Sequence, residues 1–376
     1  MTKRIFCFIL TVCCLFCSAV FPCRAQKEIS VSAKAAVLMD ADSGIVLWEK
    51  NADEIMGMAS TTKIMTALTV LKLTRPENTV SVPREAVGIE GSSVYLCEGE
   101  RLTVEQLLYA LILSSANDAA AALAIYCSGS IEAFAIQMNA AACELGLKNT
   151  NFVNPHGLYD ESHYTTAREL AVITAAAMKN ELLSKIFATK KVTIPFDNDA
   201  DGRLLTNHNK MLAYYDGAIG VKTGFTKSTG RCLVSAAKRD GMTLICVTLN
   251  APDDWRDHTA LLDYGFESFE RAVIADVGEY TCELSVTGAK KDTVTLTNTQ
   301  PLVLTLPRGA YGVKYTVLAP YRFAFAPIAR GDTLASVSVS AYGQTATSAL
   351  VATETLDAAG DKNSIWYKIL NIFKKE

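Results

Sequence analysis

The sequence has few of the residues that build nucleic-acid or metal sites. No basic stripe accompanies its formal net charge of −3, which argues against a nucleic-acid partner. Its four histidines show no metal-ligand spacing. The cysteines beyond residue 26 are scattered singly with no C-x-x-C pair, so zinc and thioredoxin-like sites have little support. We expect these cysteines to be mostly buried thiols: Cys97, Cys127, Cys143, Cys232, Cys246 and Cys282.

The N-terminal segment has the pattern of a secretory signal peptide. Two cations in residues 2–4 precede the uncharged apolar run 5–21, and Cys23 and Ala25 place small residues at the −3 and −1 positions of a cleavage site. We therefore predict that residues 1–25 direct export across the cytoplasmic membrane. A retained membrane anchor is the alternative, although the run is barely long enough to span a bilayer. Cleavage would lower the net charge from −3 to −6, because the segment holds three basic and no acidic side chains.

Residues 26–275 have the pattern of one α/β domain. Two β-rich runs, 36–40 and 45–49, flank an Asp-Ser-Gly turn and predict a hairpin. Strand character returns in residues 220–250, where 231–237 can pair with 242–250. Between these runs, helical spacing of apolar residues predicts a helical block. Its helices are expected at 60–73, 103–113, 118–126, 131–145 and 166–178. A sheet built from both ends of the segment, with the helices inserted, follows from this order.

The sequence pattern changes in the remainder of the chain. Short alternating runs separated by Pro and Gly predict a small all-β sandwich domain over residues 276–356. In the last segment, 357–376, Ile365, Ile369, Ile372 and Phe373 fall on one helical face beside lysines. Such a basic amphipathic helix can lie in a membrane interface but is too short to span it. A terminal helix that frays or docks on its own protein is an equal alternative.

The first candidate for chemistry is Ser60-Thr61-Thr62-Lys63 at the start of a helix. Residues three apart share a helix face, so the Ser60 hydroxyl and the Lys63 amine can meet. A serine hydroxyl is a poor nucleophile until a neighbouring base takes its proton. Lysine can act as that base only if burial or a nearby cation lowers its pKa. Alone, an S-x-x-K match carries little weight, because a serine cap followed by a solvated lysine is common.

Two later motifs strengthen the prediction. Ser115-Ala116-Asn117, at the break between two predicted helices, offers a hydroxyl for proton transfer and an amide for a substrate carbonyl. Lys222-Thr223-Gly224, in a predicted strand, offers a second cation that would depress the pKa of Lys63. Thr223 can bind a substrate carboxylate, and Gly224 leaves room for a peptide along the strand edge. The set S-x-x-K, S-x-N and K-T-G is typical of class A β-lactamases and penicillin-binding proteins.

On these motifs the chain resembles the low-molecular-weight penicillin-binding proteins of the serine D-Ala-D-Ala carboxypeptidase type. The resemblance covers about residues 30–275, and the trailing β domain and tail match the family's usual layout. It implies a serine β-lactamase/DD-peptidase-like fold with an antiparallel sheet, and no metal or organic cofactor. Further matching segments are Gly91-Ser92-Ser93 and the ranges 113–120, 151–158, 207–212 and 230–233.

The resemblance also implies roles for the motif residues. By it, Ser60 is the acylated nucleophile and Lys63 the general base. Ser115 and Asn117 complete the proton network and the grip on the substrate. The substrates would be peptidoglycan stem peptides, and β-lactam antibiotics would act as inhibitors.

The strand motif receives the remaining roles. By the same resemblance, Lys222 and Thr223 engage the terminal carboxylate of the substrate beside Gly224. The backbone N–H groups of Ser60 and Phe225 would form the oxyanion hole. Some relatives carry His where this chain has Phe225, a change that a backbone donor should tolerate.

Three other functions compete with carboxypeptidase activity. A β-lactamase needs a deacylating carboxylate before the K-T-G strand, usually Glu followed by Leu-Asn. Residues 164–171 offer Glu169 and Leu170 without that Asn, so we expect penicillin to stay bound. An endopeptidase acting on cross-links shares the same chemistry and stays open. A noncatalytic peptidoglycan-binding protein is disfavoured, because a dead scaffold has no need of the complete motif set.

Several polar residues near the motifs receive non-catalytic predictions. We expect a structural hydrogen-bonding role for His156 and a capping or bracing role for Asp118. His163, His208 and His258 are assigned nothing. Some relatives use an arginine to clamp the carboxylate, and Arg203 cannot be aligned with it securely.

Overall fold

The computed structural model describes residues 29–196, 199–310, 312–319 and 321–359. The predicted signal segment 1–25 and residues 360–376 of the predicted tail lie outside the described residues. All elements below belong to the compact unit that begins at Ser32.

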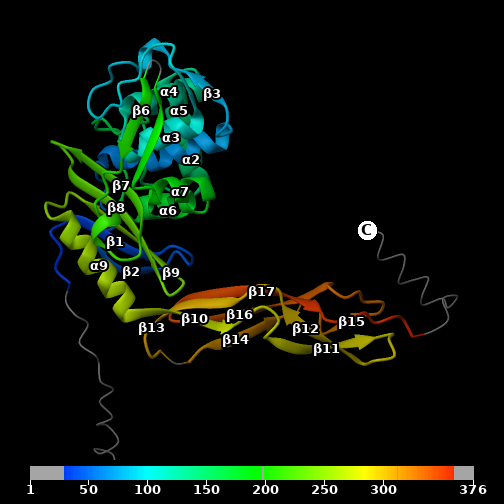
Figure 1. Cartoon of the computed structure of the whole chain (residues 1–376). Helices are drawn as coiled ribbons and strands as arrows, with labels where there is room; N and C mark the ends of the chain where they lie inside the picture. The colour runs from blue at the N-terminus through cyan, green and yellow to red at the C-terminus, as the bar shows by residue number, and fades with distance from the viewer. Residues whose placement is uncertain (1–28, 197–198, 311, 320, 360–376) are drawn as a thin grey trace, which may run out of the picture. The chain divides into compact units, whose positions relative to one another are not determined.

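An antiparallel sheet of five strands, in the order β2-β1-β9-β8-β7, organises the first part of the chain (Figure 1). The sheet joins strands from the two ends of the segment, as the sequence predicts. Strand β1, near the start, pairs with both β2 and the much later β9. The strands are β1 (Ala35–Asp40), β2 (Val46–Lys50), β7 (Ala218–Thr226), β8 (Gly230–Arg239) and β9 (Met242–Leu249).

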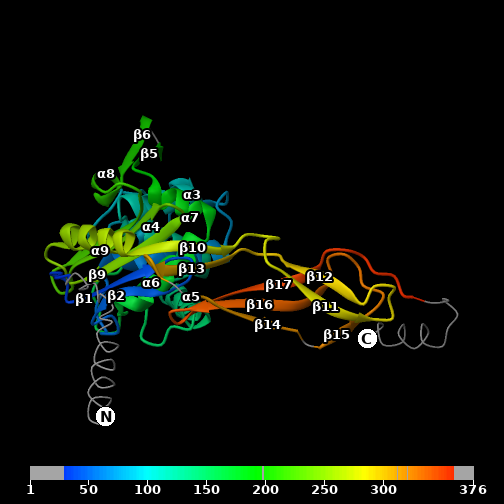
Figure 2. The ribbon, with the colours of Figure 1, turned by 90° about the horizontal axis from the view of Figure 1, so that it is seen from below.

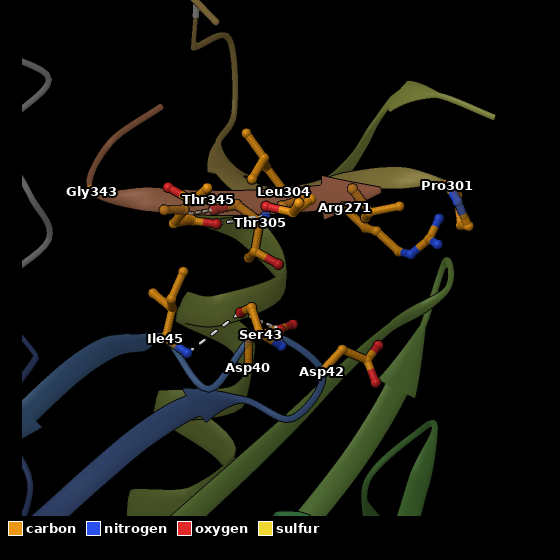
Figure 3. A pocket seen from close by; sticks show the side chains of 14 residues that line it. Asp40, Asp42, Ser43, Ile45, Arg271, Pro301, Leu304, Thr305, Gly343 and Thr345 are labelled. Atoms are coloured by element: carbon orange, nitrogen blue, oxygen red, sulfur yellow. Dashed lines mark hydrogen bonds between the residues drawn. The ribbon is translucent and has the colours of Figure 1, made fainter. Parts of the chain in front are cut away.

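The turn between β1 and β2 confirms the predicted hairpin. The Asp40 carboxylate accepts hydrogen bonds from the Ser43 amide at 2.7 Å and from the Ser43 hydroxyl at 2.6 Å. Figure 3 shows the Ile45 amide donating to the Ser43 oxygen in the same turn, at 3.4 Å. Gly44 follows with φ of 73°, a conformation that glycine adopts without the usual steric cost.

The helical block lies between β2 and β7 in the chain. Its helices are η1 (Ala59–Thr62), α2 (Lys63–Leu73), η2 (Arg84–Ala86), α3 (Val104–Leu113), α4 (Asn117–Ser128), α5 (Ile131–Glu144), α6 (Ala167–Met178), α7 (Glu181–Ala188) and α8 (Met211–Tyr214). Two short hairpins accompany them: β3 (Thr79–Ser81) with β4 (Arg101–Thr103), and β5 (Lys191–Phe196) with β6 (Asp199–Thr206). The predicted helices are present within a few residues, except that the first begins at Lys63 instead of Ser60.

Helices cover both faces of the central sheet, which explains why β1 and β9 are buried along their whole length. On β1, Ala35, Val37 and Met39 face the core shared with the helical block. The alternate residue Leu38 faces α9 (Asp254–Ser268), where Gly265 leaves no room for a Cβ atom. Figure 1 shows α9 on one side of the sheet and α6 and α7 on the other. Successive side chains along β1 therefore point alternately into the cores on the two faces of the sheet.

The β-rich part of the chain contains two further sheets (Figure 2). One has six strands in the order β14-β16-β17-β12-β11-β15, and the other pairs β10 with β13. Alternate residues from both, such as Leu304, Val294 and Val337, share one core, as in a sandwich. The strands are β10 (Phe269–Ala275), β11 (Thr281–Thr287), β12 (Thr293–Asn298), β13 (Leu302–Pro307), β14 (Lys314–Leu318), β15 (Phe323–Phe325), β16 (Thr333–Ala341) and β17 (Gln344–Ala352).

Strand β10 lies before the predicted domain boundary at residue 276 yet pairs with β13. The boundary itself stays a prediction. Within the described residues, no single helix has the length and apolar composition to cross a membrane. Helices α4 and α5 meet that test only as a pair, which bends by 83° at its break.

We predict that stability falls on mild acidification, because burial lowers the pKa of three histidines. The pKa is about 3 for His156, about 4 for His163 and about 3 for His258, against an ordinary 6.5. The unfolded chain therefore binds more protons below pH 6.5, and each histidine removes about 1.4 kcal/mol per pH unit until its folded pKa is reached. Urea unfolding at pH 7, 6 and 5 measures this slope. His258→Gln should lower this slope by about 1.4 kcal/mol per pH unit, the contribution of one histidine, and an equal slope in the variant would contradict the expectation.

Candidate active site

The Ser60–Lys63 pair sits on a turn of 3₁₀ helix that leads into α2. The Thr61 and Thr62 hydroxyls donate to the Met58 and Ala59 carbonyls three residues back, at 2.6 and 2.7 Å. This i, i+3 geometry explains why the regular helix begins only at Lys63. In a 3₁₀ turn the side chains at i and i+3 eclipse one another. Ser60 and Lys63 are thereby brought together, and the Lys63 amine donates to the Ser60 hydroxyl at 3.0 Å.

The Lys63 amine is enclosed by acceptors from three separate segments. Besides Ser60, its Nζ donates to Asn117 Oδ1 at 2.7 Å and to the His156 carbonyl at 2.6 Å. The side chain is fully buried, at 0 % exposed. Burial, and then the charge of Lys222, holds the pKa of Lys63 well below its ordinary 10.5, against a smaller opposing effect of Asp118. A neutral amine at this position has two hydrogens for Asn117 and the His156 carbonyl, and its lone pair can then accept the proton of the Ser60 hydroxyl.

Lys222 supplies the second cation that the sequence predicts. It is also buried, at 1 % exposed, and its Nζ donates to the Thr223 carbonyl at 2.9 Å. Burial lowers the pKa of Lys222 to about 7, so near neutral pH it carries part of a charge. Its effect on Lys63 is smaller than that of burial, the first cause of the lowered pKa.

Strand β7 lies directly against the turn that carries Ser60. A Cβ atom on Gly224 would come within 3.0 Å of the Ser60 amide nitrogen and 3.1 Å of the Met58 carbonyl oxygen. Gly224 therefore permits the close approach of two backbones. The adjacent Phe225 is 64 % exposed, with its backbone on the edge strand of the sheet.

The backbone is strained at Ser115 and just before Ser60, the two serines with predicted roles in the chemistry. Ala59, just before Ser60, has φ of 47°, and Ser115, between α3 and α4, has φ of 57°. Non-glycine residues rarely adopt this region, and such residues cluster at functional sites. Gly157 has φ of 85° and packs so tightly on Ala59 that a Cβ atom would overlap the Ala59 carbonyl. The 154–158 loop thus fixes the backbone that presents Ser60.

Asn117 and Asp118 are the first residues of helix α4, and their side chains bind different partners. Asn117 Oδ1 receives the Lys63 amine, and its Nδ2 donates one hydrogen to the Glu90 carbonyl. Asp118 accepts from the Ser93 hydroxyl at 2.6 Å and from the Leu96 amide at 3.0 Å. Asp118 therefore braces the loop before the helical break, a structural role as predicted. The predicted contact of Asn117 with substrate stays a prediction.

A pocket of about 390 Å³ opens over Ser60. Five predicted site residues line it: Ser60, Ser115, Thr223, Gly224 and Phe225. Lys63, Asn117 and Lys222 are buried outside its lining. The other lining residues had received no predicted role, although the first four lie in segments that match the family: Ser92, His208, Lys210, Arg231, Asp254 and Trp255. A larger pocket of about 610 Å³ lies elsewhere, and none of the predicted site residues lines it. We therefore assign the chemistry to the pocket at Ser60.

The far wall of this pocket combines charge and an aromatic ring. Arg231, in β8, donates to the buried Asp254 carboxylate at 2.8 Å. The guanidinium also lies 5.7 Å from the centre of the Trp255 ring. Arg231 lies in the matching segment 230–233, but Asp254 and Trp255 begin α9, which was not predicted, so their place in the pocket had no signal in the sequence.

The histidines and Glu169 stabilise the surroundings of the site. His163 Nε2 lies 2.8 Å from the Thr62 hydroxyl, and its Nδ1 accepts from the Val153 amide at 3.1 Å. Glu169 accepts from the Lys148 and Asn149 amides, at 2.8 and 3.0 Å. Its carboxylate is engaged in this loop, away from the lining of the pocket. His163, to which the sequence assigned nothing, thus braces the turn of the predicted nucleophile.

Arg203 is engaged elsewhere. It forms an ion pair with the buried Glu100 at 2.9 Å and donates to the Tyr95 carbonyl. Among the residues that the structure describes, no group of three or more His, Cys, Asp and Glu side chains could hold a metal ion.

A serine that lines the pocket beside a buried lysine, a second buried lysine and a K-T-G edge strand define a serine peptidase of the penicillin-binding class. The sequence profile of the D-alanyl-D-alanine carboxypeptidase family (Peptidase_S11) matches residues 22–253. The chain belongs to this family.

Individual relatives are similar to this chain over most of its length. D-alanyl-D-alanine carboxypeptidase DacF of Bacillus subtilis is 32 % identical over 348 residues, which cover 90 % of this chain and 89 % of the relative. Penicillin-binding protein 5 of Haemophilus influenzae is 29 % identical with a TM-score of 0.73, covering 88 % of this chain and 99 % of that one. A peptidoglycan synthesis regulatory factor (PBP3) of Streptococcus pneumoniae is 25 % identical with a TM-score of 0.78, covering 88 % and 100 %. These similarities bear out the predicted fold class.

We predict that Lys222→Met moves the acid limb of Ser60 acylation to higher pH. Removing the cation raises the pKa of Lys63, so the amine is protonated, and the base lost, at a higher pH than in the parent. The shift should be about one pH unit. The measurement is the acylation rate against pH with a neutral chromogenic ester, which needs no carboxylate contact. Lys210→Met, on the pocket wall, is the matched control, and an unmoved limb in Lys222→Met would refute the coupling.

Proposed function

We propose that this chain is a serine D-Ala-D-Ala carboxypeptidase that releases the terminal D-alanine of peptidoglycan stem peptides through an acyl-enzyme on Ser60. The observation that carries the proposal is the 3.0 Å contact between Ser60 Oγ and the buried Lys63 Nζ. Family membership supports the substrate class, because DacF of Bacillus subtilis is named a D-alanyl-D-alanine carboxypeptidase.

In the acylation step, neutral Lys63 accepts the proton of the Ser60 hydroxyl. Ser60 Oγ attacks the carbonyl carbon of the penultimate D-alanine, and a C–O bond forms. The C–N bond to the terminal D-alanine then breaks, and the leaving nitrogen receives a proton from the resulting ammonium. Ser115 lines the same pocket and can relay that proton. D-alanine leaves, and water later hydrolyses the ester.

Two contacts would orient the substrate. The Thr223 hydroxyl, on the pocket wall in β7, would bind the carboxylate of the substrate, and the partial positive charge of the buried Lys222 behind it would add attraction. The Ser60 and Phe225 amides are the candidate donors to the oxyanion, held close together by the tight packing at Gly224. Donors fixed in advance stabilise the developing charge without reorganisation.

Slow hydrolysis of a penicillin adduct follows from the position of Glu169. A β-lactamase needs a carboxylate that activates water at the acyl-enzyme. Glu169 instead accepts hydrogen bonds from the 148–150 segment, including the Thr150 hydroxyl at 2.5 Å. We therefore favour a penicillin-inhibited peptidase over a β-lactamase. DD-endopeptidase activity on cross-links uses the same groups and is the second candidate, since the pocket is open on its solvent side.

We further propose that the protein acts outside the cytoplasmic membrane, attached to its surface. The apolar run 5–21 and the cleavage pattern before Gln26 support export. The basic amphipathic pattern of 357–376 supports attachment through the C-terminal segment.

We predict a long-lived covalent adduct with benzylpenicillin on Ser60. Intact-protein mass spectrometry should show the mass of one added penicillin, and Ser60→Ala should lose both the adduct and D-alanine release. Without the nucleophile the rate should fall by at least about three orders of magnitude. Ser92→Ala, on the same pocket wall, controls for loss of a hydroxyl. Rapid turnover of the drug would favour a β-lactamase, and muropeptide binding without turnover would favour a noncatalytic protein.

We predict that the C-terminal segment promotes membrane attachment. The chain from Gln26 should float with anionic liposomes, and removal of 357–376 should reduce the floated fraction severalfold, because its apolar face and lysines are lost. Equal flotation of both forms would end the proposed role of the tail.

A further inference from the structure

Exposed apolar side chains are concentrated in one stretch of the β-rich part. Tyr315, Val317, Leu318, Tyr321, Phe323 and Phe325 are all exposed large apolar residues within one short segment. Three aromatic residues follow one another at the end of this stretch: Tyr321 is 75 % exposed, and Phe323 and Phe325, on β15, are 42 % and 52 % exposed. We call these three residues the aromatic edge. Clustered exposed apolar groups of this kind mark an interaction surface.

The pairing of β15 explains why the two phenylalanines face outward. Phe323 and Phe325 lie opposite Ser285 and Thr287 in the parallel pair of β15 with β11. All four are exposed, whereas the intervening Val286 is buried in the sandwich core. The two rings meet edge to face, with centroids 5.2 Å apart. They therefore form a preassembled apolar surface on the solvent side of the sheet.

The last described residues run beside this surface. The Ala359 amide donates to the Gly288 carbonyl at 2.6 Å, and Ala358 bridges to Ala289. Gly288 follows Thr287, the partner of Phe325 in the sheet. Figures 1 and 2 both show the end of the β-rich part where β15 lies beside β11. The basic amphipathic pattern beyond Ala359 thus begins at the same end of the domain as the aromatic edge.

Cations accompany the apolar groups. Arg322 lies between Tyr321 and Phe323 and is exposed, and Lys290 is exposed two residues beyond Gly288. Tyrosine, phenylalanine and basic side chains together suit the interface of an anionic bilayer, where apolar rings reach the acyl boundary and cations meet the headgroups.

We propose that the aromatic edge is a second membrane contact, which enters the interface of an anionic bilayer beside the C-terminal segment. The proposal rests on the proposed export and attachment, because a lipid surface must be available, and not on the peptidase chemistry. Strand addition by a protein partner is disfavoured, since β15 has three residues and offers a short edge. Two adjacent contacts would hold the domain more firmly than one, by raising the effective concentration of each at the surface.

The test compares membrane partitioning of matched variants. The chain from Gln26 is used with vesicles of phosphatidylglycerol and phosphatidylcholine, with residues 360–376 present or deleted. The edge variant combines Tyr321→Ser, Phe323→Thr and Phe325→Thr, which keep strand-forming residues in β15. Tyr342→Ser is the control, because this tyrosine is also exposed, at 59 %, in the turn between β16 and β17. Urea unfolding midpoints establish that each variant is folded.

We expect the edge variant to lower the partition coefficient roughly tenfold with or without residues 360–376, and the control to leave it unchanged. Hydrogen exchange of residues 315–325 should slow when vesicles are added to the parent. Equal partitioning of parent and edge variant would overturn the proposal, even if deletion of the tail weakens binding. Faster exchange of 315–325 on deletion of the tail, without vesicles, would also overturn it, because the tail would then be the occupant of the edge.

Discussion

The active site depends on one buried amine, that of Lys63. Lys63 Nζ lies within hydrogen-bond distance of Ser60, Asn117 and the His156 carbonyl, which come from three separate segments of the chain. These bonds position the Nζ atom, and the surrounding protein removes it from water. Desolvation disfavours the charged form of a lysine, so the cost of burial is what makes it a base.

The backbone around this amine is constrained more tightly than an ordinary core requires. Ala59 and Ser115 hold left-handed conformations, Gly157 packs against the Ala59 carbonyl, and Gly224 lets β7 approach the Ser60 amide. His163 braces the turn through Thr62. Each of these features positions a donor or an acceptor around Ser60, whose side chain opens on the pocket. Strain and close packing of this kind are consistent with preorganised electrostatics at a catalytic centre.

Local patterns of the sequence predict much of this arrangement. The Asp-Ser-Gly turn, the helical spacing after Lys63 and the alternation in β8 and β9 are decided by neighbouring residues, and the structure contains them. Helix α9 and the β5–β6 hairpin were missed: α9 has a largely polar sequence, and Pro195 argues against a strand in β5. The His156 carbonyl, the His163 brace and the Arg231–Asp254 wall depend on contacts between distant segments. No local pattern contains that information.

The most direct test is a titration of Lys63 itself. Nuclear magnetic resonance of lysine labelled at the ε carbon, with Lys63 assigned by substitution to arginine, reports the charge of its amine as the pH changes. We expect a midpoint well below 10.5 in the parent chain, because burial and the neighbouring Lys222 lower the pKa of Lys63. A Lys63 amine that stays charged up to pH 10.5 would contradict it, since the Ser60 hydroxyl would then have no base at neutral pH.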